Sequence, residues 1–564
     1  MKLYQLCFVK RLIFPLFFIV VSLVACNNNS SKKPAEKVIV DKPEQMETVV
    51  SENIDELLTY LKGNEGKLND SVKVFSLPQV DKVYQNTSFR TVWSKDQKWQ
   101  PIADSMFYMV MHAKEYGLFP TDYHAEILND FHNKIIADPS SKKNAILWTR
   151  ADVLLTDAWF GMAKDLKLGR LAKDSVTLRN DTLVNDDYFF NKFQGAIASG
   201  NVLGVLREQE PTNRFYVALK EALPSFLDTA KFKKVVYITY PGKDSISLNT
   251  QVQERLVEEG YIAAPLAAGD SAGLKKVLTA FQHVKKIKET GKINESVVRN
   301  LNYTDWEKFK RIALNLDRYK QLPDSLPQAY AWVNLPAFSL RVFDTDTIAL
   351  QSKVICGSPI TRTPLLTSAI SNFITYPQWT VPYSIIFKEM LPRIQKNTDY
   401  LDKQNLMVID ANDSMIDPKT IDWSKLNKTH FPYLLKQRQG DDNSLGVIKF
   451  NFPNKYSVYM HDTNARRLFG NSYRALSHGC VRVQDWKIFS DYLIRNDTTK
   501  FPADTINAWM TRQEKHVVSG FKKLPLYIRY NTCEGNDGKV KFYDDIYGVD
   551  RMLSEKYFAN KNVY

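Results

Sequence analysis

The chain has 564 residues, of which 44% are hydrophobic and 24% are charged, and its formal net charge is +14. This composition excludes a largely disordered protein, and the length predicts about three or four domains with substantial cores. The positive charge favours an acidic partner, which is either a nucleic acid or an anionic wall polymer or membrane surface. The N-terminal segment decides between these partners.

The N-terminus has the pattern of an export signal. Lys2, Lys10 and Arg11 form a basic start, residues 12–24 are apolar, and Cys26 follows Leu-Val-Ala. The apolar run is short for a membrane-spanning helix, and small residues precede the cysteine as they do at a cleavage site. The end of this run resembles a bacterial lipobox, which implies that Cys26 is lipidated; a plain signal peptide or an anchor helix is the alternative. We therefore expect an exported lipoprotein that is anchored in a membrane, faces the periplasm and has no nucleic-acid partner.

Helical patterns follow the signal. Residues 26–48 are polar with few aromatics, so we predict a disordered tether after a signal peptide of residues 1–25. Residues 49–245 are predicted to form a helical domain. Apolar side chains recur at helical spacing over residues 51–63 and 102–116, and a glycine marks the end of each run.

A compact unit of three helices is predicted over residues 246–303. Its central helix has one apolar face, formed by Leu274, Val277, Leu278 and Phe281. From these residues alone it is an ordinary small helical bundle. A further helix is predicted within residues 304–327, where apolar residues again recur at helical spacing.

The pattern changes to strands near residue 328. Short runs with β-branched and aromatic residues, bounded by Gly and Pro, predict a mostly-β domain over residues 328–548. Residues 383–436 interrupt it with a mixed, basic and helix-prone stretch, which is either a surface insertion or a lid. Strands over residues 447–450 and 456–460 are predicted to lead to His461.

The clearest chemical pattern is His461 followed nineteen residues later by Cys480, which lies in the run Ser477-His478-Gly479-Cys480-Val481-Arg482. A thiol attacks as the thiolate, so it needs a base or a cation nearby. His461 is the candidate base, and the charge of Arg482 is expected to favour the thiolate. Gly479 lets the backbone approach a substrate, and the amides around Cys480 are candidates for oxyanion stabilisation.

Each of these residues alone has a simpler interpretation. A single His is usually structural, and a single Cys is usually a small buried apolar residue. A zinc site is a second alternative, because His461, His478 and Cys480 are possible ligands, but their spacing is not that of paired zinc ligands. We expect neither a metal nor a cofactor.

The His461 to Arg482 pattern resembles the YkuD-like catalytic domain of L,D-transpeptidases, which cross-link peptidoglycan. Residues 117–124 and 167–171 are similar to the scaffold region of the larger, YcbB-like members, and residues 383–436 correspond to their capping subdomain. Residues 246–303, with Gly-Tyr-Ile, Ala-Phe-Gln and a final Leu-Asn, resemble a three-helix peptidoglycan-binding module. The resemblance implies an α+β multidomain fold: an α-helical scaffold, this inserted module and a β-rich catalytic domain with a capping insertion.

The resemblance also implies the reaction and its residues. Cys480 is the nucleophile, His461 is the base, and Ser477, His478, Gly479 and Arg482 shape the active-site loop. The expected partners are peptidoglycan stem peptides, a tetrapeptide donor and an acceptor stem amine joined in a 3-3 cross-link. An L,D-carboxypeptidase, or a non-catalytic lipoprotein that binds the wall, are the alternatives.

Two further cysteines remain open. If Cys480 stays reduced, Cys356 and Cys533 either pair or lie buried as thiols, and the sequence does not decide between these states.

Overall fold

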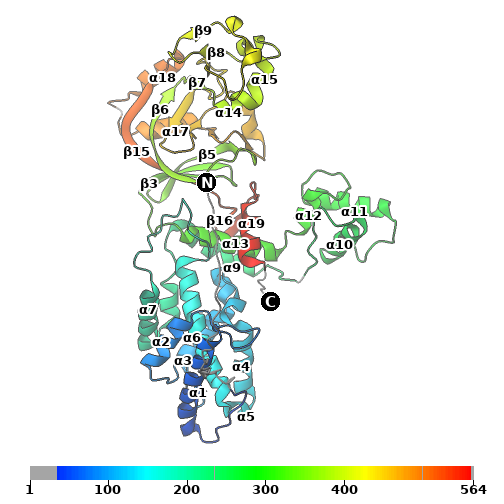
Figure 1. Cartoon of the computed structure of the whole chain (residues 1–564), viewed down its shortest axis with the longest axis vertical. Helices are drawn as coiled ribbons and strands as arrows, with labels where there is room; N and C mark the ends of the chain where they lie inside the picture. The colour runs from blue at the N-terminus through cyan, green and yellow to red at the C-terminus, as the bar shows by residue number, and fades with distance from the viewer. Residues whose placement is uncertain (1–34, 234, 498, 560–564) are drawn as a thin grey trace, which may run out of the picture.

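The structure is a computed structural model that describes residues 35–233, 235–497 and 499–559. Figure 1 shows a helical scaffold below, a β-rich domain above and a small helical module at one side. The predicted α+β multidomain fold is confirmed. The signal peptide, Cys26 and the first part of the tether lie outside the described residues. Within those ranges, no helix is long and apolar enough to cross a membrane.

The scaffold is built around α6 (Ala145–Leu168), a helix of 24 residues that is buried on most of its surface. Asn144 caps its N-terminus by accepting a hydrogen bond from the Ile146 amide. Six scaffold helices pack against α6: α1 (Pro43–Gly63), α2 (Leu77–Asn86), α3 (Pro101–Met111), α4 (Ala125–Ala137), α7 (Asp186–Ser199) and α8 (Val202–Arg207). The short α5 (Pro139–Lys142) contacts α4, and α9 (Arg214–Leu227) contacts α13 (Asp305–Lys320). Large aromatic side chains, including Trp93, Trp148 and Trp159, fill the space between the scaffold helices.

The predicted disordered tether was wrong for its second part. Helix α1 begins at Pro43, because Met46 and Val50 extend the apolar stripe of the predicted helix by two turns and are buried. Before it, the Val40 amide donates to the Lys143 carbonyl, and the Ala145 amide donates to the Val38 carbonyl. The chain is therefore held against the scaffold from about residue 38.

The small module consists of α10 (Ser245–Glu258), α11 (Ser271–Val284) and α12 (Glu295–Leu301) around a core of its own. Buried Arg255 links α10 to the end of α12, because the guanidinium contacts Glu258 and Glu259 and donates to the Leu301 carbonyl. The chain then returns to the scaffold as α13 (Asp305–Lys320). The module thus projects from the scaffold between α9 and α13 (Figure 1).

The scaffold and the β-rich domain share one hydrophobic core. Residues of α9 and α13 pack with Trp332 and Phe343 of the sheet and with Phe558 of α19 (Val549–Phe558). The hairpin β16 (Cys533–Asn536) and β17 (Lys539–Phe542) lies against α9. A Cβ on Gly535 would lie 1.9 Å from the Ala218 carbonyl oxygen, so the two backbones touch there. The β-rich domain therefore packs directly against the helical scaffold.

The β-rich domain has nine strands in the order β13-β5-β14-β12-β11-β6-β15-β3-β4, and a pairing of β4 with β5 closes the sheet into a barrel-like form. The strands are β3 (Ala329–Asn334), β4 (Ser339–Asp344), β5 (Thr347–Gly357), β6 (Leu366–Thr375), β11 (Ile448–Asn451), β12 (Met460–His461), β13 (Ala475–Ser477), β14 (Val481–Val483) and β15 (Val517–Arg529). Helices α17 (Trp486–Ile494) and α18 (Ala503–Thr511) complete its core.

The strand predicted over residues 456–460 is shorter than expected, since only Met460 and His461 pair as β12. The Asn454 side chain explains the difference. It accepts from the amides of Tyr456 and Val458 and donates to the Val458 carbonyl, which folds this segment into a turn.

The capping insertion, which the sequence had indicated as a mixed and helix-prone stretch, is a small subdomain with its own sheet, β7-β10-β8-β9. Its strands are β7 (Trp379–Thr380), β8 (Leu406–Ile409), β9 (Met415–Ile416) and β10 (Leu434–Gln437), and its helical turns are α14 (Tyr383–Ile385), the π-turn η3 (Ile386–Met390), α15 (Leu391–Ile394) and α16 (Asp399–Lys403). Strands of two to four residues are too short to show a period in the sequence. The insertion encloses a core of its own that includes Ile386, Leu401, Val408 and Leu435.

Candidate active site

The loop that carries Cys480 is fixed by its own side chains. The Ser477 hydroxyl donates to the Cys480 carbonyl at 2.6 Å and accepts from the Gly479 amide at 3.2 Å. Gly479 has a φ of +122°, a region that side chains with a Cβ rarely adopt. The Thr363 hydroxyl donates to the Gly479 carbonyl at 2.8 Å. Both carbonyls therefore point away from the substrate side, and within the described residues the Cys480 amide donates no hydrogen bond.

The strand register brings the predicted residues together. Strands β12 and β14 run parallel, with Met460 opposite Val481 and His461 opposite Arg482. Since side chains alternate along a strand, Met460 and Val481 enter the core, where both are fully buried. His461, Arg482 and Cys480 therefore lie on the other face. This is the face on which a base and a nucleophile can share a substrate.

His461 is buried, with 5% of its surface exposed, and its Nδ1 has no hydrogen-bond partner among the described residues. Burial lowers its pKa to about 3, and the charges of Arg482 and Lys449 act in the same direction. The imidazole is therefore neutral at physiological pH. Neutral imidazole is the form that can accept a proton.

Burial raises the pKa of the Cys480 thiol. Hydrogen bonding from Tyr459 and the charges of Lys449 and Arg482 oppose this rise, but burial dominates. The charge of Arg482 acts in the expected direction, since it lowers the pKa of the Cys480 thiol. The site at rest contains a neutral thiol and a neutral imidazole.

Two residues of the site were missed by the sequence reasoning. Lys449 lies directly opposite His461 on β11, and its Nζ is 4.1 Å from the centre of the Tyr459 ring. Tyr459 precedes Met460 and interacts with both Cys480 and Trp379 of the cap, and burial raises its pKa well above the ordinary range. Its hydroxyl therefore stays protonated and can donate. Tyr459 could have been found from the sequence, because it lies two residues before His461 and alternation puts it on the same face. Lys449 could not, because its position opposite His461 depends on which strands pair.

Asp462, next to the base, has a structural role. It is fully buried and accepts hydrogen bonds from the Val447 amide at 3.1 Å and from the Arg466 guanidinium. These contacts fix the turn that follows β12.

His478 joins the catalytic loop to the cap. Its Nε2 lies 2.6 Å from Glu389 Oε1 on the π-turn η3, and both side chains are about half exposed. The cap and the active-site loop are therefore in direct contact, through this pair and through the contact of Trp379 with Tyr459.

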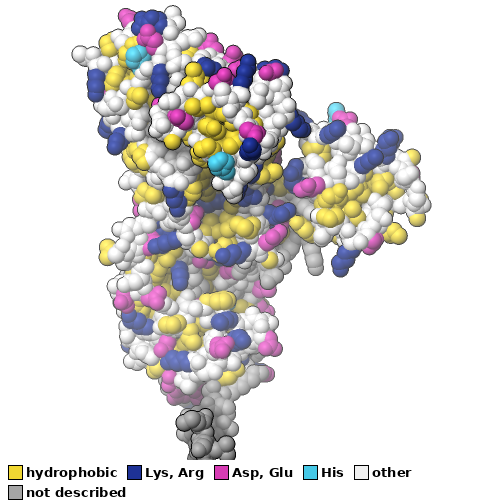
Figure 2. Space-filling model, turned by 45° about the horizontal axis from the view of Figure 1, so that its top comes forward, with side chains coloured by type: hydrophobic (Ala, Val, Ile, Leu, Met, Phe, Trp, Pro, Cys, Tyr) yellow, Lys and Arg dark blue, Asp and Glu magenta, His cyan; other side chains and the backbone are white. Residues whose placement is uncertain are grey.

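The cap also carries a cluster of aromatic side chains with ring centres 5.4–6.2 Å apart, in which one contact is stacked and three are edge-to-face: Tyr383, Phe387, Phe431 and Tyr433. Figure 2 shows hydrophobic side chains gathered on the upper lobe of the molecule, with charged side chains around them.

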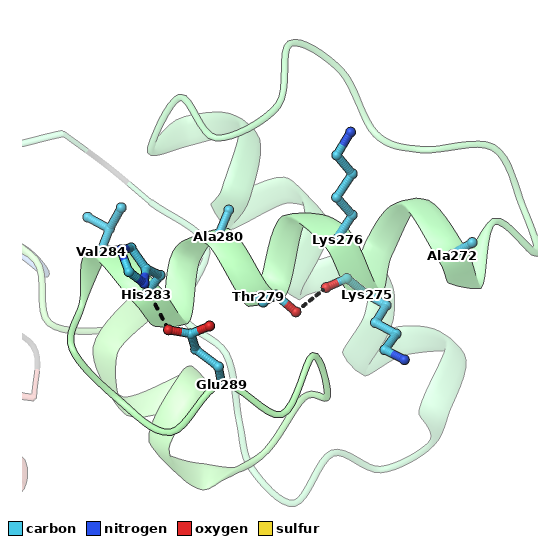
Figure 3. Close-up of a pocket in the computed structure, with 8 residues that line it drawn as sticks. All are labelled: Ala272, Lys275, Lys276, Thr279, Ala280, His283, Val284 and Glu289. Carbon is cyan, nitrogen blue, oxygen red and sulfur yellow. Dashed lines mark hydrogen bonds and ion pairs between the residues drawn. The ribbon is translucent and has the colours of Figure 1, made fainter.

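Two hollows of the described surface lie away from Cys480. One runs along α11 and is bordered by Lys275, Lys276, Thr279 and the paired His283 and Glu289 (Figure 3). The other is bordered by basic residues near Lys353. Within the described residues, no group of three His, Cys, Asp or Glu side chains is placed to hold a metal ion.

Cys356 and Cys533 are free, buried thiols. Cys356 is paired with Ala475 of β13 and lies in the same hydrophobic core as Val481, so it is on the opposite face from Cys480. Burial raises the pKa of Cys356 to about 12 and that of Cys533 well above its ordinary value. Cys480 is thus the only described cysteine that is partly exposed.

Comparison with known proteins agrees with this geometry. Residues 328–499 match the L,D-transpeptidase catalytic domain of the YkuD family, and residues 78–223 match the Scaffold domain family. A Haemophilus influenzae protein named "Putative L,D-transpeptidase" is 31% identical over 254 residues, which covers 43% of this chain and 49% of the relative. The match therefore spans about half of the relative's length. This chain carries an L,D-transpeptidase catalytic domain of the YkuD family joined to a helical scaffold domain.

Proposed function

We propose that this protein forms 3-3 cross-links between peptidoglycan stem peptides, with Cys480 as the nucleophile. The observation that carries the proposal is the shared face of Cys480, neutral His461 and Tyr459. On this face the amide of Cys480 has no hydrogen-bond partner within the described residues.

In the first half-reaction, the Cys480 sulfur attacks the carbonyl between the third residue of a donor tetrapeptide and its terminal D-Ala. His461 takes the thiol proton as the carbon–sulfur bond forms. The Cys480 amide and the Tyr459 hydroxyl can donate to the oxyanion. The carbon–nitrogen bond then breaks, and His461 returns the proton to the leaving amine of D-Ala.

The cations near His461 favour this last step. Lys449 and Arg482 lower the pKa of the imidazole, so the imidazolium that forms in the reaction is a strong acid. It gives its proton readily to the departing amine. The same cations favour the thiolate of Cys480 during proton transfer.

In the second half-reaction, the side-chain amine of an acceptor stem attacks the thioester. His461 takes the amine proton, the carbon–sulfur bond breaks, and the proton passes to the sulfur. Water in place of the amine would give an L,D-carboxypeptidase. Transfer is favoured when an amine is held in line at high effective concentration.

The two outcomes differ in their products. Purified protein is incubated with a disaccharide-tetrapeptide, and the muropeptides are identified by mass. A dimer lighter by one D-Ala supports the proposal. Trimmed tripeptide without dimer would identify a carboxypeptidase, and unchanged substrate would favour a non-catalytic wall-binding role.

We propose further that the cap, residues 383–436, opens to admit stem peptides, because Trp379 and Glu389 bridge it to the catalytic loop. A Glu389→Gln variant is expected to raise the rate of Cys480 alkylation by a small reagent about two- to five-fold, since an exposed ion pair contributes up to ~1 kcal/mol. Asp402→Asn, an exposed cap substitution away from this contact, is the matched control. An alkylation rate equal to that of the unchanged protein would contradict a latch at Glu389.

The three-helix module is proposed to dock the enzyme on its wall substrate. The hollow along α11 has the cations of Lys275 and Lys276 toward one end and the exposed apolar Val284 at the other (Figure 3). A role as a spacer is the alternative. Sedimentation of the protein with purified wall sacculi distinguishes the two.

The membrane anchor is also a proposal, and it rests on the small residues that precede Cys26. A Cys26→Ser variant is expected to lose metabolic lipid labelling and to leave the membrane fraction. Cys7→Ser, within the same N-terminal segment, should change neither. If the Cys26→Ser protein stayed in the membrane fraction, the proposed lipid anchor at Cys26 would be wrong.

A further inference from the structure

Three basic side chains form one row across the floor of the site. Lys449 of β11, His461 of β12 and Arg482 of β14 occupy directly opposed positions on three neighbouring strands. Their neighbours in these strands, Ile448, Phe450, Met460, Val481 and Val483, belong to the hydrophobic core, so the row faces the same side as Cys480. His461 therefore lies between two cations.

Neither cation has an anionic partner. Among the described residues, no carboxylate lies within 4.0 Å of Lys449 or Arg482, although Arg466 nearby is paired with Asp462. Arg482 Nε is buried and makes no hydrogen bond within the part of the chain that is described. Lys449 lies over the face of the Tyr459 ring, and both cations also interact with the charge of Cys480 when its thiol is ionised.

Two half-buried cations without a counter-ion cost stability. Burial lowers the pKa of both Lys449 and Arg482, because removing their charges from water is unfavourable. An anionic group of a ligand placed between them would offset this desolvation by charge-assisted hydrogen bonds. The arrangement is thus suited to bind a carboxylate.

We propose that Lys449 and Arg482 bind the free C-terminal carboxylate of the donor stem, that is, the carboxylate of the residue that leaves. This inference rests on the proposed function and adds the group that selects the donor. The leaving amine must reach His461 to receive its proton. The carboxylate carbon of the same residue is two bonds from that amine, about 2.5 Å away, so it falls beside the cations that flank His461.

The subsite would select where the chain is cut. A donor with one more residue carries its carboxylate about 3.6 Å further from the scissile bond, where it no longer meets both cations. The enzyme would then release a single terminal residue.

The test compares two donors that differ in this one group, a disaccharide-tetrapeptide acid and its C-terminal carboxamide. Acylation of Cys480 is followed by intact mass under single-turnover conditions. We expect the unchanged protein to acylate about tenfold or more faster from the acid, in line with hydrogen bonds to charged groups. Lys449→Met and Arg482→Met should each reduce the acid rate toward the amide rate and bring the ratio close to one.

The ratio is the informative quantity, because both substitutions also change the reactivity of Cys480 and would slow the two donors together. Lys522→Met, an exposed lysine of β15, is the matched control and should keep the full acid preference. The two donors can also be compared for binding to Cys480→Ala protein, where no chemistry intervenes.

Equal acylation of the unchanged protein by both donors would overturn the subsite and leave the proposed function intact. An acid preference that survives in both Lys449→Met and Arg482→Met would overturn it as well. If neither donor acylates the unchanged protein, the proposed function fails, and the subsite fails with it.

Discussion

Replacing His461 by Gln is expected to reduce turnover of stem peptides by about 10²- to 10⁴-fold, the range found for general acid–base groups. Gln has a similar size and fills the buried position, but it cannot accept the thiol proton. The Nδ1 of His461 has no partner among the described residues, so the substitution breaks no hydrogen bond of that atom.

The matched control is His430→Gln, an exposed histidine of the cap. The melting temperatures of the two variants and the unchanged protein are compared by calorimetry, so that a loss of fold is recognised. Turnover within a few-fold of the unchanged protein, in a folded His461→Gln variant, would remove His461 from the mechanism.

The second large effect is on the pH dependence of Cys480 alkylation. Burial raises the pKa of the thiol above its ordinary value of 9.0, and only the thiolate reacts. The alkylation rate by iodoacetamide should therefore rise about tenfold per pH unit between pH 7 and 9. No inflection is expected near pH 6, because the pKa of His461 is lowered to about 3.

Cys480→Ala protein supplies the background from the buried thiols Cys356 and Cys533. A rate that is high and flat between pH 6 and 8 would show a preformed thiolate–imidazolium pair. That result would contradict the neutral resting state derived from the burial of Cys480 and His461.

The sequence suggests Cys480 as the nucleophile and His461 as the base, because the features that point to them are local. Ser477, Gly479 and Cys480 form one loop, and the contacts of Ser477 with the Gly479 amide and the Cys480 carbonyl span only a few residues. His461 follows a short strand whose alternation fixes its face. Such patterns depend on neighbours in the chain, so they can be read without a structure.

The rest of the site depends on contacts between distant segments. Glu389 meets His478 across 89 positions of the sequence, and Lys449 meets His461 only through the pairing of β11 with β12. The protonation state of Cys480 at rest also could not be predicted from the sequence. The motif shows that Arg482 is near Cys480, but it does not show that burial outweighs that charge.

The fold was predictable to a similar degree. The helices and the change to strands near residue 328 follow from periodicity. The order of the tether from about residue 38 was missed, because it depends on pairing with Lys143 and Ala145. The sheet of the cap was missed since its strands are too short to show alternation.

The central claim is that Cys480 carries the acyl group, and the intact mass of the protein tests it most directly. The soluble form, lacking residues 1–26, is mixed with disaccharide-tetrapeptide and quenched in acid, which preserves thioesters. The account predicts a gain equal to the donor less D-Ala, located on Cys480 by peptide mapping and absent from Cys480→Ala protein. Product formation without this adduct at any quench time, or the same adduct on Cys480→Ala protein, would contradict it.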